Sequence, residues 1–259
     1  MAAHSKRSHR PNTAWDSQAA WYDRLVGEDG SSYHKEVVLP KTIDLLAPKA
    51  GESILDLGCG QGVLCRLLKA SSVNPTGVDL SKDLIDRAKN YDTKHISYFV
   101  DDATNLSAQF RKKQFDAAVS VLALGNMQSM AGFFESAFDA VKSNGRLVFV
   151  IMHPCFRIPR QSHWQYDEAK KLQYRRIDRY LTPMPIPILT HPGKNDSAYS
   201  MMFHRPLHEI ISSAAQAGWL INAVEEWTSN KTSSGVKAKA ENRARNEIPL
   251  FLAIAAIKQ

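Results

Sequence analysis

An acid and three glycines recur at alternate positions in one short stretch, where Asp56, Gly58, Gly60 and Gly62 form the pattern D-x-G-x-G-x-G. An apolar run precedes the glycines and an apolar-periodic segment follows them, which predicts a strand, a turn and a helix. Glycine lacks a Cβ, so it allows positive φ and lets a ligand lie against bare backbone. The start of the helix offers free N–H groups to an anionic part of that ligand. The stretch therefore predicts a binding turn in a nucleotide-type α/β fold.

A second acid, Asp79, ends the next predicted strand, a little over twenty residues beyond Asp56. The ribose-binding acid occupies this place in the dinucleotide-binding architecture. A carboxylate there accepts hydrogen bonds from both ribose hydroxyls, and its charge repels a 2′-phosphate. We therefore predict that Asp79 binds a ribose, with Leu80 beside it. The alternative is that Asp79 is a surface turn residue.

The glycine spacing differs from the dinucleotide fingerprint G-x-G-x-x-G. With Asp56 and Asp79 it resembles motif I and the strand-two acid of class I S-adenosylmethionine-dependent methyltransferases. The specific motifs run from about Lys49 to Met152, and the resemblance continues by topology to the C-terminus. It implies S-adenosylmethionine as the cofactor, with the glycine turn beneath its methionine part. The alternative is a doubly wound fold that uses these glycines only to turn.

The same resemblance implies further cofactor contacts. An acid followed by a small residue after the third strand hydrogen-bonds the adenine amino group in that family. Asp102, which precedes Ala103, fits this position better than Asp101, but the two adjacent acids leave the choice open. Asn105 is near enough to assist, and the fourth strand ends at Val121, facing the methyl group. The predicted cofactor-binding residues are Asp56, Gly58, Cys59, Gly60, Gln61, Gly62, Asp79, Leu80, Asp102, Ala103, Val121 and Tyr33.

A histidine follows the fifth predicted strand, in the sequence His153-Pro154-Cys155. A side chain at this end of a strand points into the crevice where open α/β sheets bind ligands, and His-Pro here resembles many small-molecule methyltransferases. A pKa near neutrality suits a general base or a hydrogen bond to the acceptor. His153 is therefore the predicted catalytic residue, with packing at the strand end as the alternative. Tyr33 and His34 are predicted to touch the cofactor carboxylate or the acceptor.

Two signatures of nucleic-acid methyltransferases are missing. Enzymes that methylate exocyclic adenine amines resemble one another in an N/D/S-P-P-aromatic tetrad after the fourth strand, where this chain has Leu-Ala-Leu-Gly at 122–125. Cytosine-C5 RNA enzymes pair a Pro-Cys after strand four with a second cysteine, and this chain has only Pro154-Cys155, after strand five. Neither a base-flipping amine clamp nor covalent cysteine catalysis is predicted.

Residues 157–200 interrupt the strand–helix alternation where a short connection is expected. A connection of this length is usually functional or disordered, and this one holds too many aromatic residues for disorder. We therefore predict an inserted segment over the acceptor, residues 153–203, which we call the lid. Its arginines suit an acidic or phosphorylated acceptor, or else Arg175, Arg176 and Arg179 form a solvated helical face. The arginines in question are Arg157, Arg160, Arg175, Arg176 and Arg179.

Composition is ordinary for a soluble globular protein of 259 residues, with 44% hydrophobic and 23% charged residues. No apolar run approaches the ~20 residues of a membrane span, and no apolar region follows the basic N-terminus, so no secretory signal is predicted. The cysteines, Cys59, Cys65 and Cys155, are odd in number and lack metal-type spacing. We therefore predict reduced thiols, no metal site and a cytoplasmic location.

The net charge of +7 is uneven along the chain. Residues 1–14, 153–200 and 229–247 carry +3, +4 and +3, which leaves −3 for the rest. A basic periphery attracts polyanions such as RNA, but it is also typical of solvated loops and tails. Nucleic acid is therefore an alternative partner that the sequence does not favour.

The remaining segments supply the elements that must position these residues. Helices are predicted over residues 13–27, 33–46, 63–70, 82–90, 130–141 and 204–217, and strands over 53–57, 74–80, 96–100, 115–121, 146–152, 219–227 and 249–257. Residues 228–247 form a polar, basic excursion between the last two strands. The expected fold is α/β, a Rossmann-like doubly wound seven-stranded sheet, mostly parallel with the last strand antiparallel. Its parts are a disordered basic tail (1–14), cover helices and cofactor core (15–152), the lid (153–203) and a C-terminal part (204–259).

The mechanism implied by the resemblance is in-line transfer of a sulfonium methyl group to an O, N or C atom of a small molecule. Such catalysis is largely positioning, because the cofactor brings the electrophile. One alternative is an RNA or protein methyltransferase that uses the basic lid and tail. Another is a non-catalytic cofactor-binding module. No oligomeric state is predicted.

Overall fold

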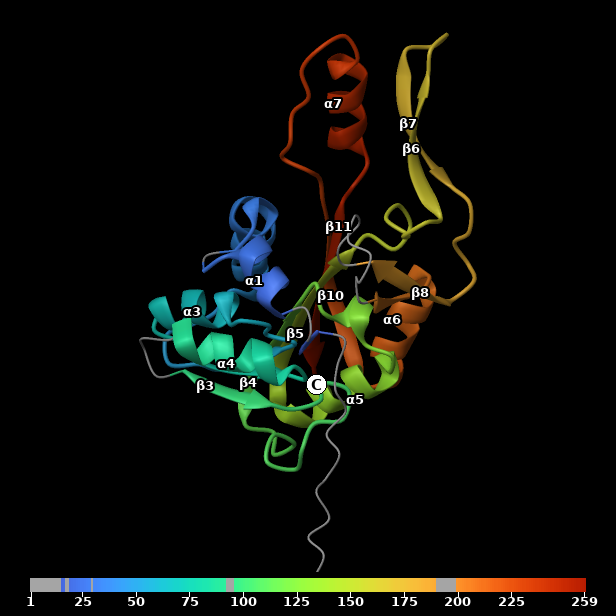
Figure 1. Ribbon diagram of the computed structural model, residues 1–259. Helices are drawn as coiled ribbons and strands as arrows, with labels where there is room; N and C mark the ends of the chain where they lie inside the picture. Colours follow the sequence, from blue (N-terminus) through green and yellow to red (C-terminus); the bar gives the residue numbers. More distant parts are fainter. Residues whose placement is uncertain (1–14, 17–18, 29, 92–95, 190–198) are drawn as a thin grey trace, which may run out of the picture.

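The computed structural model describes residues 15–259 except 17–18, 29, 92–95 and 190–198. The predicted tail and part of the lid therefore lie outside the described residues. Within them the main sheet has seven strands in the order β10-β11-β5-β4-β1-β2-β3 (Figure 1). These strands are β1 Ser53–Leu57, β2 Asn74–Asp79, β3 Ser97–Val100, β4 Phe115–Val121, β5 Val141–Met152, β10 Trp219–Trp227 and β11 Phe251–Lys258.

The pairing directions confirm the predicted sheet. Strands β1 to β5 pair in parallel, whereas β11 runs antiparallel to both of its neighbours, β5 and β10. The strand order reverses between β1 and β4. Open α/β sheets bind ligands outside the carboxyl ends of the strands at such a switch point. The predicted site residues after β1, β2, β3 and β4 therefore gather at one edge.

Helices cover both faces of the sheet, because the central strands are apolar on both sides. Ile54 and Leu55, which point to opposite faces, are both fully buried. Helices α5 and α6 cover one face and α2 and α3 the other (Figure 1). None of the described helices combines the length and apolarity needed to traverse a lipid bilayer. The helices are α1 Ala19–Val26, α2 Leu39–Leu46, α3 Val63–Ala70, α4 Lys82–Tyr91, α5 Met130–Ala140, α6 Leu207–Gln216 and α7 Ala238–Glu247, with a π-helical turn at His34–Val38 and a 3-10 turn at Leu124–Asn126.

Two sequence predictions need correction in the C-terminal part. The polar excursion at 228–247 contains the helix α7, which has only Ala244 buried and so lacks an apolar stripe. Its residues are strong helix formers, and that intrinsic preference is the signal that periodicity misses. The helix predicted from His204 begins at Leu207, because His204 ends strand β9 and Pro206 precedes the helix.

The described part of the lid consists of two antiparallel hairpins. Strands β6 (Ser162–Asp167) and β7 (Leu172–Ile177) form the first, and β8 (Met184–Leu189) and β9 (Tyr199–His204) form the second. The first hairpin projects from the sheet beside α7 (Figure 1). Arg175 and Arg176 lie on β7, so the alternative of a helical arginine face is wrong.

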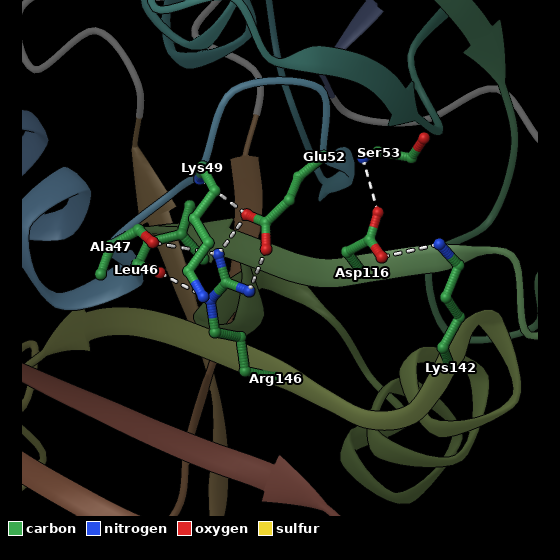
Figure 2. Close-up of polar contacts among 8 residues, drawn as sticks. All are labelled: Leu46, Ala47, Lys49, Glu52, Ser53, Asp116, Lys142 and Arg146. Carbon is green, nitrogen blue, oxygen red and sulfur yellow. Dashed lines mark hydrogen bonds and ion pairs between the residues drawn. The ribbon is translucent and has the colours of Figure 1, made fainter.

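A guanidinium ties three segments together at the opposite, amino-terminal edge of the sheet (Figure 2). Arg146, on β5, donates from Nε to the Leu46 carbonyl at 2.6 Å and from Nη2 to the Ala47 carbonyl at 3.3 Å. Its two terminal nitrogens donate to the Glu52 carboxylate at 3.0 and 2.6 Å. The side chains of Arg146 and Glu52 are only 23% and 16% exposed. Arg146 therefore anchors two segments to strand β5. These are the C-terminal end of α2 and the residue just before β1.

We predict that Arg146→Gln lowers the free energy of unfolding by about 2–3 kcal/mol, because a half-buried carboxylate and helix-end carbonyls lose a charged donor. Lys142→Gln is the matched control. Lys142 pairs with Asp116 at 2.6 Å (Figure 2), but these side chains are 46% and 30% exposed. The control should lose less than about 1 kcal/mol. Urea denaturation at pH 7 measures both, and equal losses would contradict the importance of the Arg146 contact.

Candidate active site

The turn between β1 and α3 needs glycine for its conformation and for its packing. Gly58 and Gly62 have φ of +79° and +82°. A Cβ on Gly58 would lie 2.5 Å from the Ala123 Cβ, and one on Gly62 would lie 2.4 Å from the Tyr98 hydroxyl. Such approaches exclude any side chain. The glycine turn therefore packs directly against the end of β4 and against β3.

Hydrogen bonds fix this turn to the end of β2. The Val78 carbonyl accepts from two amides of the turn, at 2.8 and 3.0 Å. The Gly60 amide donates to Oδ2 of Asp79 at 2.9 Å, and the Ser81 amide donates to Oδ1 at 2.9 Å. Burial raises the pKa of Asp79, and these two N–H groups oppose the shift. Each carboxylate oxygen retains capacity for a further donor.

Asp56 lies beneath the turn. It is 2% exposed, and the Cys65 thiol of α3 donates to its Oδ2 at 3.3 Å. Burial, assisted by the charge of Asp79, raises the pKa of Asp56 to about 7, while the Cys65 contact opposes the shift. The structure therefore brings Asp56 to the turn as a support between β1 and α3.

The two adjacent acids after β3 differ in their free oxygens. The Asp101 amide donates to the Asp79 carbonyl at 3.0 Å, which places this segment beside the ribose-binding candidate. Both carboxylate oxygens of Asp101 accept hydrogen bonds, from Ser107 and from the Asp102 amide. Asp102 uses Oδ1 for Thr104, and its Oδ2 has no partner among the described residues. This geometry favours Asp102 as the adenine contact.

The N-terminal segment, which the sequence predicts as a cover, lies over the turn and brings Tyr22 there, a residue that is not among the predicted cofactor contacts. A Cβ on Gly60 would lie 3.5 Å from the Tyr22 Cε1, so this ring lies over the turn. Burial and the two nearby carboxylates raise the pKa of Tyr22. Trp15 packs edge-on against this ring at 5.6 Å, and the Ser81 hydroxyl donates to Asp16 at 2.6 Å. The sequence predicts cover helices in this region but does not single out Tyr22 among their aromatic residues.

Gln61 joins the turn to the same cover. Its side-chain Nε2 donates to the Gly27 carbonyl at 2.5 Å, and its main-chain carbonyl accepts from the Arg66 guanidinium at 2.6 Å. Arg66 also donates to the Glu28 carbonyl at 2.5 Å. Gln61 is 1% exposed. The side chain therefore holds the end of α1 against the turn.

A small pocket of about 60 Å³ lies beyond the ends of β4 and β5. Leu122, directly after β4, adopts a left-handed φ of +55°, a conformation that is rare for residues other than glycine and often found at functional sites. The second lid hairpin supplies one wall of the pocket through β9. The lining residues include Leu122, Gly125, Met152, Arg157, Met202 and Phe203. The pocket is mostly apolar, with two guanidinium groups, those of Arg157 and Arg205, at its side.

His153 lies after β5 as predicted, but its ring nitrogens are both engaged. The Cys155 amide donates to Nδ1 at 3.2 Å, which assigns the ring proton to Nε2, 2.6 Å from the Glu226 carboxylate. The residue is 1% exposed. Burial lowers its pKa, and Glu226 opposes that shift. A role as general base stays a prediction, because it requires one nitrogen to exchange its partner for the acceptor.

The structure does not place every predicted cofactor contact at the turn. Tyr33 lies with the residues after β10, where its hydroxyl is 2.9 Å from the Ser229 hydroxyl and its ring packs on Phe251. Leu80 is 38% exposed beside Asp79, and Ala103 is buried. Val121 ends β4 as predicted.

Comparisons with known proteins agree with this geometry. Residues 32–181, more than half of the chain, match the family model described as Methyltransferase domain. The chain is 34% identical over 150 residues to demethylmenaquinone methyltransferase of Tropheryma whipplei, covering 57% of this chain and 61% of that protein. It is 29% identical over 132 residues to ubiquinone biosynthesis O-methyltransferase of Hydrogenovibrio crunogenus, covering 50% and 54%. The chain thus spans less than two thirds of the length of these relatives.

A solved structure matches over more of the chain. The S-adenosylmethionine dependent methyltransferase from Mesorhizobium loti superposes with a TM-score of 0.69 at 27% identity, covering 90% of this chain and 100% of that chain. A match over 90% of the chain confirms the predicted fold.

The raised pKa of Asp56 predicts a pH dependence of stability. In the unfolded chain the carboxyl group ionises near 3.8, whereas in the folded protein it stays protonated up to about pH 7. The folded state holds more protons between these values, so the contribution of Asp56 to the free energy of unfolding falls as pH rises through this window. Asp56→Asn should remove that fall and gain stability relative to wild type between pH 4 and pH 8.

Urea denaturation at intervals across that range measures the effect. Asp44→Asn is the control, because Asp44 is an exposed carboxylate on α2. Its profile should follow the wild type. An Asp56→Asn profile parallel to the wild type would show that Asp56 is already ionised in the folded protein.

Proposed function

This chain belongs to the methyltransferase domain family, and from that premise we propose that it transfers a methyl group from S-adenosylmethionine to an O, N or C atom of a small-molecule acceptor. One observation carries the proposal. The glycine turn is fixed to the Asp79 carboxylate at the same edge of the sheet that holds a small apolar pocket beneath the lid. A nucleoside site and an acceptor site are thus adjacent.

The residues present fit the cofactor. Asp79 retains accepting capacity on both oxygens, which suits the two ribose hydroxyls. Asp102 has a free Oδ2 within the described structure, which suits the adenine amino group. The bare backbone of the glycine turn, which the Tyr22 ring covers at Gly60, suits the methionine part. When bound, S-adenosylmethionine supplies an electrophilic sulfonium methyl group.

The acceptor pocket supports a small molecule. Its volume of about 60 Å³ and its wall of lid residues enclose a few atoms around the reacting centre. Apolar side chains there exclude water and hold the attacking atom in line, which are the main contributions a protein makes to such a transfer. The relatives named for demethylmenaquinone and for ubiquinone biosynthesis support the same class of acceptor.

We predict that Asp79→Asn weakens S-adenosylmethionine binding by about 1–3 kcal/mol, since charge-assisted hydrogen bonds to the ribose are lost. Isothermal titration calorimetry on the full chain measures this, with S-adenosylhomocysteine and NAD as further ligands. Asp83→Asn is the matched control, because Asp83 is exposed on the next helix. It should bind like the wild type.

Two results would contradict the proposal. The first is binding of NAD in place of S-adenosylmethionine by the wild type. The second is transfer of a labelled methyl group to bulk RNA but to no small molecule, with activity that falls steeply as salt rises. Unchanged affinity in a folded Asp79→Asn variant would reject the ribose assignment alone.

For His153 we predict a pH profile that separates catalysis from positioning. A general base gives a turnover number that rises with pH through the histidine pKa, here below its ordinary 6.5. If the ring takes a proton, His153→Ala removes this rise of the turnover number with pH. If the ring only positions the backbone, the variant lowers the turnover number equally at every pH. Glu226→Gln removes the charge that raises the pKa of His153, so the rise of the turnover number should move to lower pH. An unaltered turnover number in His153→Ala from pH 6 to 9 would exclude His153 from catalysis.

A further inference from the structure

Arg157 lines two cavities and has no counter-charge in the described part of the chain. It follows His153 on the lid side of β5, and it lines both the apolar acceptor pocket and a second cavity of about 150 Å³. Among the described residues, its guanidinium has no carboxylate within ion-pair distance and no hydrogen-bond acceptor. Burial lowers the pKa of Arg157, which shows that the charge is partly removed from water. A partly buried guanidinium without a partner is costly unless a ligand supplies the anion.

A second guanidinium, that of Arg175, adds positive charge beside Arg157. Arg175, on β7, donates to the Phe156 carbonyl at 2.8 Å and to the Ser162 carbonyl and hydroxyl at 3.1 and 2.8 Å. It also lies over the Trp164 ring, 5.2 Å from its centroid. Burial and the charge of Arg157 lower the pKa of Arg175 to about 10. The fold thus holds two like charges near each other, and within the described residues Arg175 has only neutral hydrogen-bond partners and the Arg157 guanidinium has none.

The second cavity has the remaining groups of an anion site. Lys231 lies over the Tyr33 ring at 4.8 Å, and the Tyr33 and Ser229 hydroxyls share a hydrogen bond at the cavity wall. The lining residues are Tyr33, Arg157, Trp164, Ser229, Lys231, Arg245, Ile248 and Leu250, and none of them is acidic. Arg245 is the lining cation that has a nearby carboxylate, at 3.6 Å from Glu241.

We propose that the second cavity binds an anionic group of the methyl acceptor, a carboxylate or a phosphate, through Arg157. The inference rests on the proposed function, because it assigns the anion to the acceptor. Arg157 borders both cavities, so a molecule anchored by its anionic group in one extends its apolar part into the other. The planar guanidinium suits bidentate recognition of either oxyanion. The acceptor is therefore an acidic small molecule.

The test uses the full chain with inorganic phosphate and acetate as separate probes at constant ionic strength. Titration is followed through the Nε–H resonance of Arg157 in protein labelled with ¹⁵N-arginine, and that resonance is assigned by its loss in Arg157→Gln. For the variants, Kd is taken from the Arg175 resonance. We expect a saturable shift with at least one probe, and about tenfold or more weaker binding in Arg157→Gln. The affinity of Arg157→Lys for the probe should fall between those of the wild type and Arg157→Gln, because lysine keeps the charge but lacks the planar guanidinium.

Arg179→Gln is the matched control, since Arg179 is an exposed lid arginine that lines neither cavity. It should bind the probes like the wild type. No saturable shift with either probe, or equal weakening in the control, would overturn the proposal.

S-adenosylmethionine affinity, measured by calorimetry on the same proteins, separates the anion site from the methyltransferase function. Wild-type protein that binds phosphate or acetate but not S-adenosylmethionine leaves the anion site standing and rejects the methyltransferase function. Loss of S-adenosylmethionine affinity in Arg157→Gln would instead assign Arg157 to the cofactor and overturn the proposal.

Discussion

The hydrogen bond from the Gly60 amide to the Asp79 carboxylate joins two segments that the chain forms separately. It exists because β1 and β2 pair in a register that sets Leu57 opposite Val78. A slip of one residue would turn Asp79 to the other side of its strand and away from the turn. The register is held by burial, since Ile54, Leu55 and Leu57 are fully enclosed between two helix layers. The candidate site therefore depends on the core beneath it.

The two edges of the sheet carry different tasks. At the amino-terminal edge Arg146 pairs with Glu52, and Lys142 pairs with Asp116. At the carboxyl edge, burial raises the pKa of Asp56 and Asp79 and lowers that of His153. Groups displaced from their ordinary pKa are typical of functional sites, because the surroundings favour ligands over water. Ion pairs therefore stabilise the amino-terminal edge, whereas at the carboxyl edge burial favours the uncharged forms of Asp56 and His153.

The sequence predicts those parts of the protein that local patterns encode. Strands β4 and β10 and helix α3 have their predicted bounds, since each is an apolar run or stripe bounded by turn residues. Helix α7 and the lid hairpins lack such patterns. Intrinsic helix preference is the signal that remains for α7, whereas the hairpins depend on packing between segments. The Arg146–Glu52 contact joins residues 94 positions apart, and Tyr22 reaches the glycine turn only once α1 is docked. Motif residues were predictable and their supports were not.

The fold determines which cations of the two basic segments are paired, enclosed or exposed. The two basic segments, residues 153–200 and 229–247, meet where the first lid hairpin lies beside α7 (Figure 1). Several of their cations are paired there, as Lys237 is with Glu168 and Arg176 with Asp178. Among their other described cations, Arg157 and Lys231 line a cavity of about 150 Å³, whereas several more, such as Arg179 and Lys239, are exposed on the surface. A polyanion needs an extended track of exposed cations, whereas an enclosed cluster selects one small anionic group. The enclosed cations around Arg157 therefore support the proposal of an acidic small-molecule acceptor.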